Sequence, residues 1–570
     1  MVQRIQASVV VVGGGPVGLS LALDLAWRGL EVVVAEQRAA AEPPSFKCNH
    51  VSARSMEIFR RLGLAAEIRR AGLPDDYPND VVFRTRATGY ELTRIPIPCR
   101  AERFSSRTGP DTGWPTPEPA HRINQTFFEP ILFRHAAESP RIRLLSRTRI
   151  ESLEQGPTSV RAQGHDLDSG ATVELEAAYL VGCDGGRSLV RRQIGARLEG
   201  DELIQRVQST CIRAPGLLAR ITPPRAWMSY IYNPERAGNL VAIDGRERWL
   251  IHNYLLPHEH DFAAVDRDRA IRAILGVGAE IEYEILSKED WVGRRLVADK
   301  FRERRVFICG DAAHLWVPYA GYGMNAGIAD ATNLSWLLAA HLKGWAPEAI
   351  LDAHERERQP ITEQVSRFAM RHAERAIRER TQLPAALEEP STAGEAARAA
   401  VGEAAYALHV QQFGCAGLNF GYFYDDSPLI AYDEEPAPAY SMREYTPSSA
   451  PGCRTPHFWL TEGRSLYDAL GPDYTLLQFD AGAAVEPLVR AAGRSSLPLK
   501  VLEAPVPERP AAYRHRLLIV RPDQHVAWRG DALPADPDGL VDRLRGAGLP
   551  SSSKSKPESR HENQTLSVPR

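Results

Sequence analysis

SVVVVGGGPVGLSLALDLAWRGLEVVVAE, residues 8–36, is the stretch of this 570-residue chain that decides the fold. Residues 9–12 are four consecutive valines, which is typical of a strand buried on both faces. The spacing G-x-G-x-x-G follows at once in residues 13–18, and residues 19–28 then have the apolar spacing of a helix. Residues 31–36 form a second apolar strand that ends in an acid. Strand, tight turn, helix and strand in this order predict a dinucleotide-binding unit.

The glycines and the acid of this unit have separate predicted tasks. Gly13 permits the turn, Gly15 lets the backbone approach a pyrophosphate at the helix start, and Gly18 lets helix and strand pack closely. Glu36 can accept hydrogen bonds from both hydroxyls of a ribose. This pattern alone leaves open whether the nucleotide is FAD or NAD. The candidate nucleotide contacts of the unit are Gly13, Gly15, Pro16, Gly18, Glu36 and Gln37.

The overall composition excludes several other classes of protein. A net charge of −3 does not indicate a polyanion-binding protein, so no nucleic-acid partner is expected. The seven cysteines are scattered singly, without a CxxC or a metal-ligand spacing, which favours a reduced, cytoplasmic protein that holds no metal. No apolar run reaches the ~18 residues of a membrane span, and no signal peptide opens the chain. We therefore expect no membrane association.

Further along the chain, strand and helix patterns alternate in blocks. Residues 80–99 and 203–286 read as short alternating strands, which predicts an antiparallel sheet with one covered face, suited to be the floor of a ligand site. An irregular loop is expected for residues 100–120. A helix is predicted over residues 121–139, with Arg122, Gln125 and Glu129 on one stripe. Other predicted helices are residues 325–343 and 352–381, and residues 383–401 are weakly structured or helical.

The composition changes near residue 451, where a small domain begins. Its predicted strands are residues 474–479, 499–503 and 515–521. Its predicted helices are residues 483–492 and 538–544, and Pro487 indicates that the first helix begins late. Residues 551–570 are polar and are predicted to be disordered.

Three apolar strands end in motifs that belong together: G-x-G-x-x-G at residues 13–18, Asp-Gly at 184–185 and Gly-Asp at 310–311. This trio resembles the class A flavoprotein aromatic hydroxylases, the p-hydroxybenzoate hydroxylase family. PGCRTPHFWL (residues 451–460) and LYDALGPDYTLLQF (residues 466–479) are similar to the thioredoxin-like third domain of the phenol hydroxylase and aromatic-polyketide hydroxylase branch. The resemblance covers about residues 5–545.

The resemblance implies an α/β fold with three domains: a Rossmann-like FAD-binding domain, an antiparallel-sheet substrate domain and a thioredoxin-like α/β domain. The expected boundaries are 1–80, 100–190 and 287–400 for the discontinuous FAD-binding domain, 81–99 and 191–286 for the substrate domain, 401–448 for a linker or helical segment, 449–548 for the thioredoxin-like domain and 551–570 for the disordered tail. Cys453 has no CxxC partner, so no thiol redox activity is expected in the third domain.

The resemblance also assigns roles to individual residues. Asp311 would bind the ribityl chain of FAD, and Asp184 would serve FAD and NAD(P)H together. Pro318 and residues 321–325 would run alongside the isoalloxazine ring of FAD. Lys47 stands where the family usually has arginine. The candidate FAD contacts outside the first unit are Arg54, Arg122, Gln125, Asp184, Gly310, Asp311, Pro318, Gly321, Gly323, Met324 and Asn325.

The activity that the resemblance implies is aromatic hydroxylation with non-covalent FAD. NAD(P)H reduces FAD, O2 adds to give a 4a-hydroperoxyflavin, and an oxygen atom passes to a phenolic ring. Deprotonation activates a phenol, so a base or a hydrogen-bond relay is needed. His314 is one further candidate for the base, although its place in the family motif suggests that it supports the neighbouring loop. Only one face of each strand in the antiparallel sheet can point toward the flavin, and the sequence pattern leaves open which face this is. The candidate catalytic residues are Tyr230, Tyr232, His252, Tyr254 and Pro318, with Asn253 as a further candidate for the relay.

Several alternatives remain open at this stage. Aromatic hydroxylation is the main interpretation. The hydroxylation can be coupled to loss of a nitro, halogen or carboxyl group, or it can be a tailoring step on an aromatic polyketide. A flavin halogenase would carry a W-x-W-x-I-P signature, which is absent. A plain NAD enzyme would have no need of ICGDAAH (residues 308–314), and a non-catalytic flavin scaffold is the remote alternative. The expected partners are a small aromatic substrate, O2 and NAD(P)H, with a homodimer as the oligomer to test.

Overall fold

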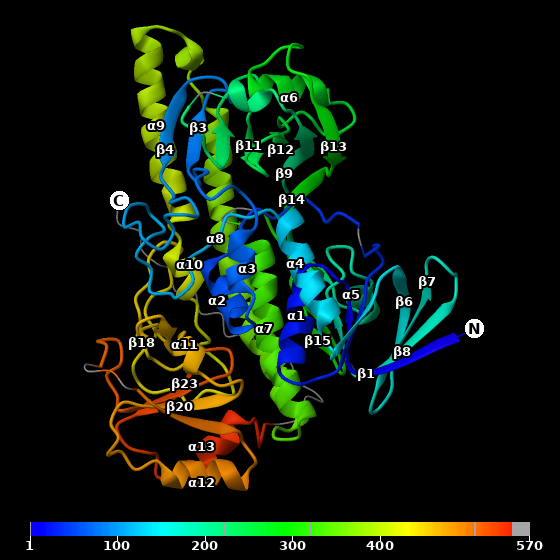
Figure 1. Ribbon diagram of the computed structural model, residues 1–570, viewed down its shortest axis with the longest axis vertical. Helices are drawn as coiled ribbons and strands as arrows, with labels where there is room; N and C mark the ends of the chain where they lie inside the picture. Colours follow the sequence, from blue (N-terminus) through cyan, green and yellow to red (C-terminus); the bar gives the residue numbers. More distant parts are fainter. Residues whose placement is uncertain are drawn as a thin grey trace.

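A computed structural model of the chain describes residues 2–40, 42–221, 223–317, 321–504, 506 and 509–549. Pro318 and the predicted disordered tail lie outside the described residues. Figure 1 shows three tiers along the long axis of the molecule. An antiparallel sheet is at the top, a mostly parallel sheet with its helices is in the middle, and a small α/β unit is at the bottom.

The middle tier is built on a sheet in which the three strands with end motifs are neighbours. Its strand order is β15-β16-β8-β1-β2-β5, with β6 and β7 continuing from β8. Val12 is in register with Gly182, and Gly182 with Ile308, so β1, β8 and β16 end at one level. The strands are β1 (Val2–Val12), β2 (Val32–Ala35), β5 (Ile142–Leu145), β6 (Thr148–Gln155), β7 (Val160–Asp166), β8 (Thr172–Gly182), β15 (Arg302–Glu303) and β16 (Val306–Ile308).

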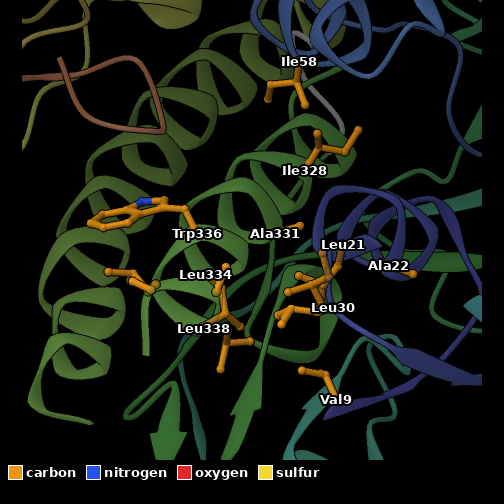
Figure 2. Close-up of a cluster of buried hydrophobic side chains, with 14 of the residues drawn as sticks. Val9, Leu21, Ala22, Leu30, Ile58, Ile328, Ala331, Leu334, Trp336 and Leu338 are labelled. Atoms are coloured by element: carbon orange, nitrogen blue, oxygen red, sulfur yellow. The ribbon is translucent and has the colours of Figure 1, made fainter. Parts of the chain in front are cut away.

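Two helices pack together against this sheet and form its main core. Helix α1 (Pro16–Trp27) follows the glycine turn, and helix α7 (Gly323–Leu342) is buried along almost its whole length. Figure 2 shows Leu21 of α1 close to Ala331 and Leu334 of α7. The predicted strand, turn, helix and strand of residues 8–36 are thus confirmed, and the packing holds α7 against the strand ends.

The upper tier is an antiparallel sheet with the order β17-β14-β9-β12-β11-β10-β3-β4, and β13 pairs with β9. Segment 80–99 joins it, and β14, from the segment that we assigned to the FAD-binding domain, pairs with β9. The strands are β3 (Val81–Arg84), β4 (Glu91–Ile95), β9 (Leu198–Arg213), β10 (Met228–Ile231), β11 (Gly238–Ala242), β12 (Arg248–Tyr254), β13 (Glu284–Lys288), β14 (Trp291–Ala298) and β17 (His314–Leu315).

One element of the upper tier contradicts the prediction that residues 203–286 are all strands. Helix α6 (Arg267–Leu275) begins at the N-cap Asp266, whose side chain accepts from the backbone N–H of Arg269, and ends at Gly276 with φ +73°. Ile271 and Ile274 recur at helical spacing and are buried. The helix forms because its cap, its C-terminal glycine and its apolar face agree.

Helices connect the tiers. α8 runs from the middle tier to the upper sheet, and α9 stands beside β3 and β4 (Figure 1). α9 is a regular helix of 22 residues, which agrees with the helical one of the two alternatives left open for residues 383–401. A Cβ at its Gly402 would lie 2.2 Å from the carbonyl oxygen of Leu92, so glycine permits close contact with β4. The helices are α2 (Ala53–Arg61), α3 (Ala65–Arg70), α4 (Gln125–Glu138), α5 (Leu189–Gln193), α8 (Ala353–Thr381), α9 (Thr392–Phe413) and α10 (Ala416–Phe420).

The lower tier is a four-stranded sheet with the order β21-β20-β22-β23, together with short strands and three helices. Helix α12 begins at Glu486, three residues later than the apolar pattern alone suggested, as Pro487 predicted. Strand β23 was not predicted. The elements are β18 (Trp459–Thr461), β19 (Arg464–Ser465), α11 (Leu466–Ala469), β20 (Tyr474–Gln478), α12 (Glu486–Arg494), β21 (Leu499–Glu503), β22 (Leu517–Val520), β23 (Val526–Gly530) and α13 (Pro537–Leu544).

Among the helices within the described ranges, none is both long and apolar enough to cross a membrane.

Candidate active site

The glycine turn after β1 is tight on one side and open on the other. Gly13 has φ +106°, and a Cβ there would lie 2.3 Å from the carbonyl oxygen of Cys183. A Cβ on Gly18 would lie 2.0 Å from the carbonyl oxygen of Gly13, so glycine is required for this close packing. A Cβ on Gly15 would meet no atom within 4 Å. The open side at Gly15 is where a pyrophosphate would approach the first turn of α1.

A chain of hydrogen bonds joins Glu36 to Gln125 across the strand ends. Glu36 accepts from the backbone N–H groups of Gly14 at 2.7 Å and Arg38 at 2.9 Å. The guanidinium of Arg38 pairs with Glu129 at 2.8 Å, and the side-chain amide of Gln125 donates to Glu129 at 2.7 Å. Burial raises the pKa of Glu129 although Arg38 opposes the shift. The structure therefore brings two predicted residues into one group and adds Arg38, which the sequence motif did not reveal.

The acids at the other two strand ends differ in their surroundings. Asp184 accepts from the backbone N–H groups of Leu189 at 2.7 Å and Val190 at 3.1 Å, while its Oδ1 is buried with no partner among the described residues. Asp311 is exposed, yet loss of solvation raises the pKa of its carboxyl, against the opposing charges of His314 and Lys47. The carboxyl of Asp311 is therefore open to a ligand and poorly solvated at the same time.

These observations test whether a dinucleotide fits the site. Open space beside Gly15, an acceptor on Asp184 without a partner in the described residues and the poorly solvated carboxyl of Asp311 all lie at adjacent strand ends. Hydroxyl groups of a ribose or a ribityl chain are the donors that such carboxylates accept. The residues present fit a flavin dinucleotide.

A buried group that the sequence did not indicate holds the Gly310 strand end in place. Asp330 of α7 accepts from the backbone N–H of Gly310 at 3.2 Å and from the guanidinium of Arg358 of α8 at 2.8 Å. Its Oδ2 lies 2.6 Å from Nε2 of His314, whose ring stacks on Trp316 with centroids 4.6 Å apart. Burial would raise the pKa of Asp330, but His314 and Arg358 outweigh it and lower that pKa. His314 therefore supports the strand end.

Asn325, at the start of α7, ties the loop of residues 321–325 to helix α2. Its Oδ1 accepts from the backbone N–H of Ser52 at 2.8 Å and from the hydroxyl of Ser55 at 2.7 Å. Its Nδ2 donates to the carbonyl oxygens of Gly321 at 2.6 Å and His50 at 3.2 Å. Because protein groups occupy both ends of the amide, Asn325 is placed to position the loop. We call residues 321–325 the flavin loop below.

The remaining candidates of the flavin loop and the first unit have varied surroundings. Gly321 has φ +60°, and a Cβ there would lie 3.0 Å from Nδ1 of His50. Gly323 is the first residue of α7, and Met324 is half-buried against the main core. Gln37 is exposed just after β2.

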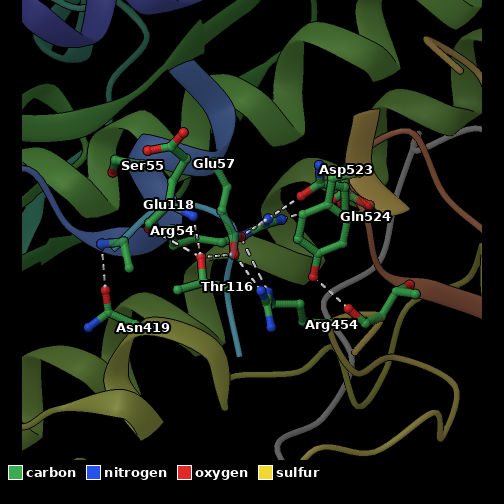
Figure 3. Close-up of polar contacts among 12 residues, drawn as sticks. Arg54, Ser55, Glu57, Thr116, Glu118, Asn419, Arg454, Asp523 and Gln524 are labelled. Atoms are coloured by element: carbon green, nitrogen blue, oxygen red, sulfur yellow. Dashed lines mark hydrogen bonds and ion pairs between the residues drawn. The ribbon is translucent and has the colours of Figure 1, made fainter. Parts of the chain in front are cut away.

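Two predicted arginines make close contacts within the protein. Arg54 donates to Glu57 at 2.9 Å and to the carbonyl oxygen of Asp523 in the lower tier at 2.6 Å (Figure 3). Arg122 pairs with Asp111 at 3.4 Å and lies over the ring of Trp227, and burial lowers its pKa to about 10. The structure thus uses both guanidinium groups for contacts within the protein.

The prediction that Arg122 shares a helical stripe with Gln125 and Glu129 is wrong. Helix α4 begins at Gln125, because Asn124 is its N-cap and accepts from the backbone N–H of Thr126 at 2.9 Å. Arg122 therefore lies before the helix in extended chain.

The register of the upper sheet decides which face carries the candidate catalytic residues. Tyr230 is opposite Asn239, and Asn239 is opposite His252, so all three point to one face, which we call the inner face. Arg248, four residues before His252 and on the same face, lies over the ring of Phe127 of α4 at 5.4 Å. The inner face is therefore turned toward the middle tier.

The opposite face carries Asn253, which the sequence left as a candidate. Its side chain donates to Gln208 at 2.9 Å, and Gln208 in turn donates to the carbonyl oxygen of Phe262, close to the start of α6. Asn253 is thus part of the packing beneath α6.

His252 and Tyr254 lie on the inner face and are half-buried. The ring of His252 lies edge-on to Trp291, and burial lowers its pKa to about 4. Its Nδ1 is buried with no hydrogen-bond partner in the described part of the chain. Tyr254 accepts from Asn239 at 3.1 Å and lies under the guanidinium of Arg380 at 4.2 Å.

Tyr230 and Tyr232 form a wall with helices α8 and α9. The hydroxyl of Tyr232 lies 2.7 Å from Glu379 and 2.9 Å from Nε2 of His409. Tyr230 accepts from Gln412 at 2.8 Å. Burial is the main cause that lowers the pKa of His409, so its imidazole is neutral at pH 7. The sequence did not reveal this wall, because no local spacing shows that α9 meets the strand that carries Tyr230.

A Rossmann-type sheet with three motifs at adjacent strand ends, an antiparallel sheet facing it and a third α/β domain define a flavoprotein hydroxylase. The chain belongs to the FAD binding domain family, whose model matches residues 6–369. Residues 448–547 match the C-terminal domain of aromatic-ring hydroxylases. The predicted family and fold class are confirmed.

Individual known proteins agree with this assignment. The chain is 30% identical to aklavinone 12-hydroxylase RdmE of Streptomyces purpurascens, over 93% of this chain and 96% of that one. It is 28% identical to phenol 2-monooxygenase of Pseudomonas sp. (strain EST1001), over 96% and 94%. The solved structure of the rebeccamycin biosynthetic enzyme RebC with reduced flavin matches with a TM-score of 0.87 at 36% identity, over 95% of this chain and 99% of that one. The protein is an FAD-dependent monooxygenase of the aromatic hydroxylase class.

Proposed function

We propose that the protein hydroxylates a phenolic ring that lies between the inner face of the upper sheet and the flavin loop, with NAD(P)H and O2 as co-substrates. The observation that carries this proposal is the inner face itself, where Tyr230, His252 and Tyr254 all face the tier that binds FAD. The names of two relatives, phenol 2-monooxygenase and aklavinone 12-hydroxylase, support an aromatic substrate.

The residues of the chain bind and orient the cofactor. Asp311 would accept a hydrogen bond from a ribityl hydroxyl, Glu36 would face the ribose, and the open backbone at Gly15 would approach the pyrophosphate. Backbone groups near Gly321 would lie beside the pyrimidine edge of the flavin ring, where the reduced ring carries negative charge. Bound FAD supplies electron transfer from NAD(P)H and activation of O2.

The inner face and its wall would exclude water and handle the substrate hydroxyl. Tyr232 and His409 are buried, which closes the side of the site next to α9. In the neutral tautomer that is protonated at Nε2, the buried Nδ1 of His252 carries a lone pair with no partner in the described residues and can accept a hydrogen bond from a phenol. A phenolate next to His252 would raise the low pKa of the imidazole. This favours transfer of the proton from the phenol hydroxyl to the imidazole.

Changing His252 to phenylalanine tests this contact. We expect the variant to bind a phenol about 3- to 10-fold more weakly, because a neutral hydrogen bond contributes about 0.5–1.5 kcal/mol. Binding is followed by the change in flavin absorbance. The methyl ether of the same phenol is the control, since it has no proton to donate and should bind both proteins equally. Equal weakening for both ligands would assign His252 to packing.

The timing of flavin reduction is a second test. The sequence contains one dinucleotide fingerprint, at residues 13–18, so the nicotinamide has no dedicated second site of that kind. We expect NAD(P)H to reduce the flavin slowly alone and at least about tenfold faster with a suitable phenol, which corresponds to about 1.4 kcal/mol of barrier. Anaerobic stopped-flow absorbance measures both rates, and product mass then shows whether oxygen was added. Equal rates with and without every phenol tried would contradict the proposal.

A further inference from the structure

We infer that the C-terminal α/β domain positions the flavin loop through helix α2, so that residues of the lower tier control how well flavin oxidation is coupled to hydroxylation. This inference rests on the proposed function, because it takes the flavin loop to lie beside the isoalloxazine ring. Helix α2 lies in the middle tier between the lower domain and the upper sheet (Figure 1).

The first link is a buried ionic group between α2 and the lower tier (Figure 3). Glu57 of α2 pairs with Arg54 of the same helix at 2.9 Å and with Arg454 of the C-terminal domain. Thr116 donates to Glu57 at 2.7 Å. The side chains of Glu57, Arg54 and Arg454 are at most 5% exposed, so solvent does not screen their charges.

The second link fixes the end of α2 that faces the flavin loop. Arg54 also donates to the carbonyl oxygen of Asp523 at 2.6 Å and to the side chain of Gln524, which are both in the turn before β23. Ser52 and Ser55 in the first turn of α2 donate to Asn325. Asn325 in turn donates to the carbonyl oxygen of Gly321 at 2.6 Å. The path from the C-terminal domain to the flavin loop is continuous.

The energetics make this path stiff. Two guanidinium groups share the carboxylate of Glu57, and their charges outweigh burial and lower the pKa of that carboxyl. Arg454 also lies over the ring of Phe420 at 4.4 Å. A displacement of Arg454 would leave buried charge unpaired, which is costly, so α2 has to follow the C-terminal domain. The amide of Asn325 then carries that displacement to Gly321.

The functional consequence of a displaced flavin loop is that more H2O2 is formed and less substrate is hydroxylated. If the flavin loop is displaced by a fraction of an ångström, the reacting part of the flavin is less well shielded from water. Electrons taken from NAD(P)H then reduce O2 to H2O2 and the aromatic ring is not hydroxylated. Arg454 would be a positioning residue for the reaction, although it does not touch substrate or cofactor.

The experiment compares Arg454→Gln with the matched control Arg529→Gln in the full-length, FAD-loaded protein. Arg529 is also a buried arginine of the C-terminal domain, and it pairs with Asp433 at 2.7 Å and Glu435 at 2.8 Å, away from α2. The readout is H2O2 released per NAD(P)H oxidised in the presence of a phenol that the wild type hydroxylates. FAD per chain and the thermal midpoint are measured on the same samples.

We expect Arg454→Gln to raise the released fraction of H2O2 at least about threefold, with FAD still bound, and Arg529→Gln to keep the wild-type fraction. Arg454→Lys keeps the charge but not the paired geometry, and it should raise the fraction to a smaller extent; it is the variant to use if the glutamine variant does not fold. Equal H2O2 fractions in the Arg454 variants and the wild type, or an equal rise in Arg529→Gln, would overturn the inference. Failure of the wild type to hydroxylate any phenol would instead overturn the proposed function.

Discussion

Replacing Asp330 by asparagine is expected to lower the free energy of unfolding by about 3–5 kcal/mol. Asp330 is fully buried, and its carboxylate meets the buried guanidinium of Arg358 at 2.8 Å, the imidazole of His314 and the backbone N–H of Gly310. The amide side chain keeps the shape but removes the charge, so the guanidinium of Arg358 remains buried without its counter-ion. Urea unfolding followed by flavin release and tryptophan fluorescence measures the loss.

The pH dependence of this loss has a definite sign. The pKa of Asp330 is lowered in the folded protein, because His314 and Arg358 outweigh the effect of burial. A depressed pKa contributes stability above the unfolded value, about 3.9, and that contribution disappears as pH falls toward the folded value. The difference between wild type and Asp330→Asn is therefore greatest near pH 7 and narrows below about pH 4.

A matched exposed pair is the control for this prediction. Asp168 pairs with Arg147 at 2.9 Å, and both side chains are exposed. Asp168→Asn should change stability by less than about 1 kcal/mol, since water screens the pair. If Asp330→Asn proved as mild as this control, Asp330 would not be the residue that neutralises Arg358.

The sequence predicted those parts of the fold whose signal is local. Residues 8–36 carry their own strands, turn and helix, and the structure contains all of them. The order of three strand-end motifs predicted that distant segments meet, and β1, β8 and β16 are indeed neighbours. Helix α6 was missed because nine residues of helical spacing stand among short strands, where the two periods are hard to separate.

Contacts between distant side chains could not be predicted in this way. Asp330 and Arg358 lie on two helices, and no local spacing shows that they pair with each other or that Asp330 reaches Gly310. Arg54 was a candidate FAD contact, but its partners Asp523 and Gln524 are more than 450 residues further along the chain. Such pairs are set by tertiary packing, which a single sequence does not encode in a readable pattern.

Glycine positions can be interpreted from the sequence in part, because a glycine in a motif can mark a place where a side chain would collide with neighbouring atoms. Gly13 and Gly18 were predicted to permit a tight turn and close packing, and side chains there would collide with backbone atoms. Gly327 of α7 was not singled out, yet a Cβ there would lie 2.9 Å from the Cα of Gly310. The glycine inside a helix allows α7 to touch the Gly310 strand end, and only the packed structure shows why it is needed.

Asp311→Ala is expected to bind FAD about 10- to 150-fold more weakly than the wild type and to lose activity in parallel. The change removes a charged acceptor for a hydroxyl of the ribityl chain, and a hydrogen bond to a charged group contributes about 1.5–3 kcal/mol. Quenching of flavin fluorescence on titration into the apoprotein measures the affinity. Unchanged flavin content and turnover would make Asp311 a structural residue at the start of its turn.

Asp311→Asn separates the charge of this residue from its ability to accept a hydrogen bond. The amide oxygen still accepts, so we expect an affinity between those of the wild type and Asp311→Ala. Because poor solvation raises the pKa of Asp311, the wild-type carboxylate begins to protonate at a higher pH than an ordinary aspartate. Lowering the pH toward that pKa should weaken FAD binding to the wild type more than to Asp311→Asn, which has no carboxyl to protonate. Parallel pH profiles for the two proteins would mean that the charge of Asp311 does not act on the cofactor.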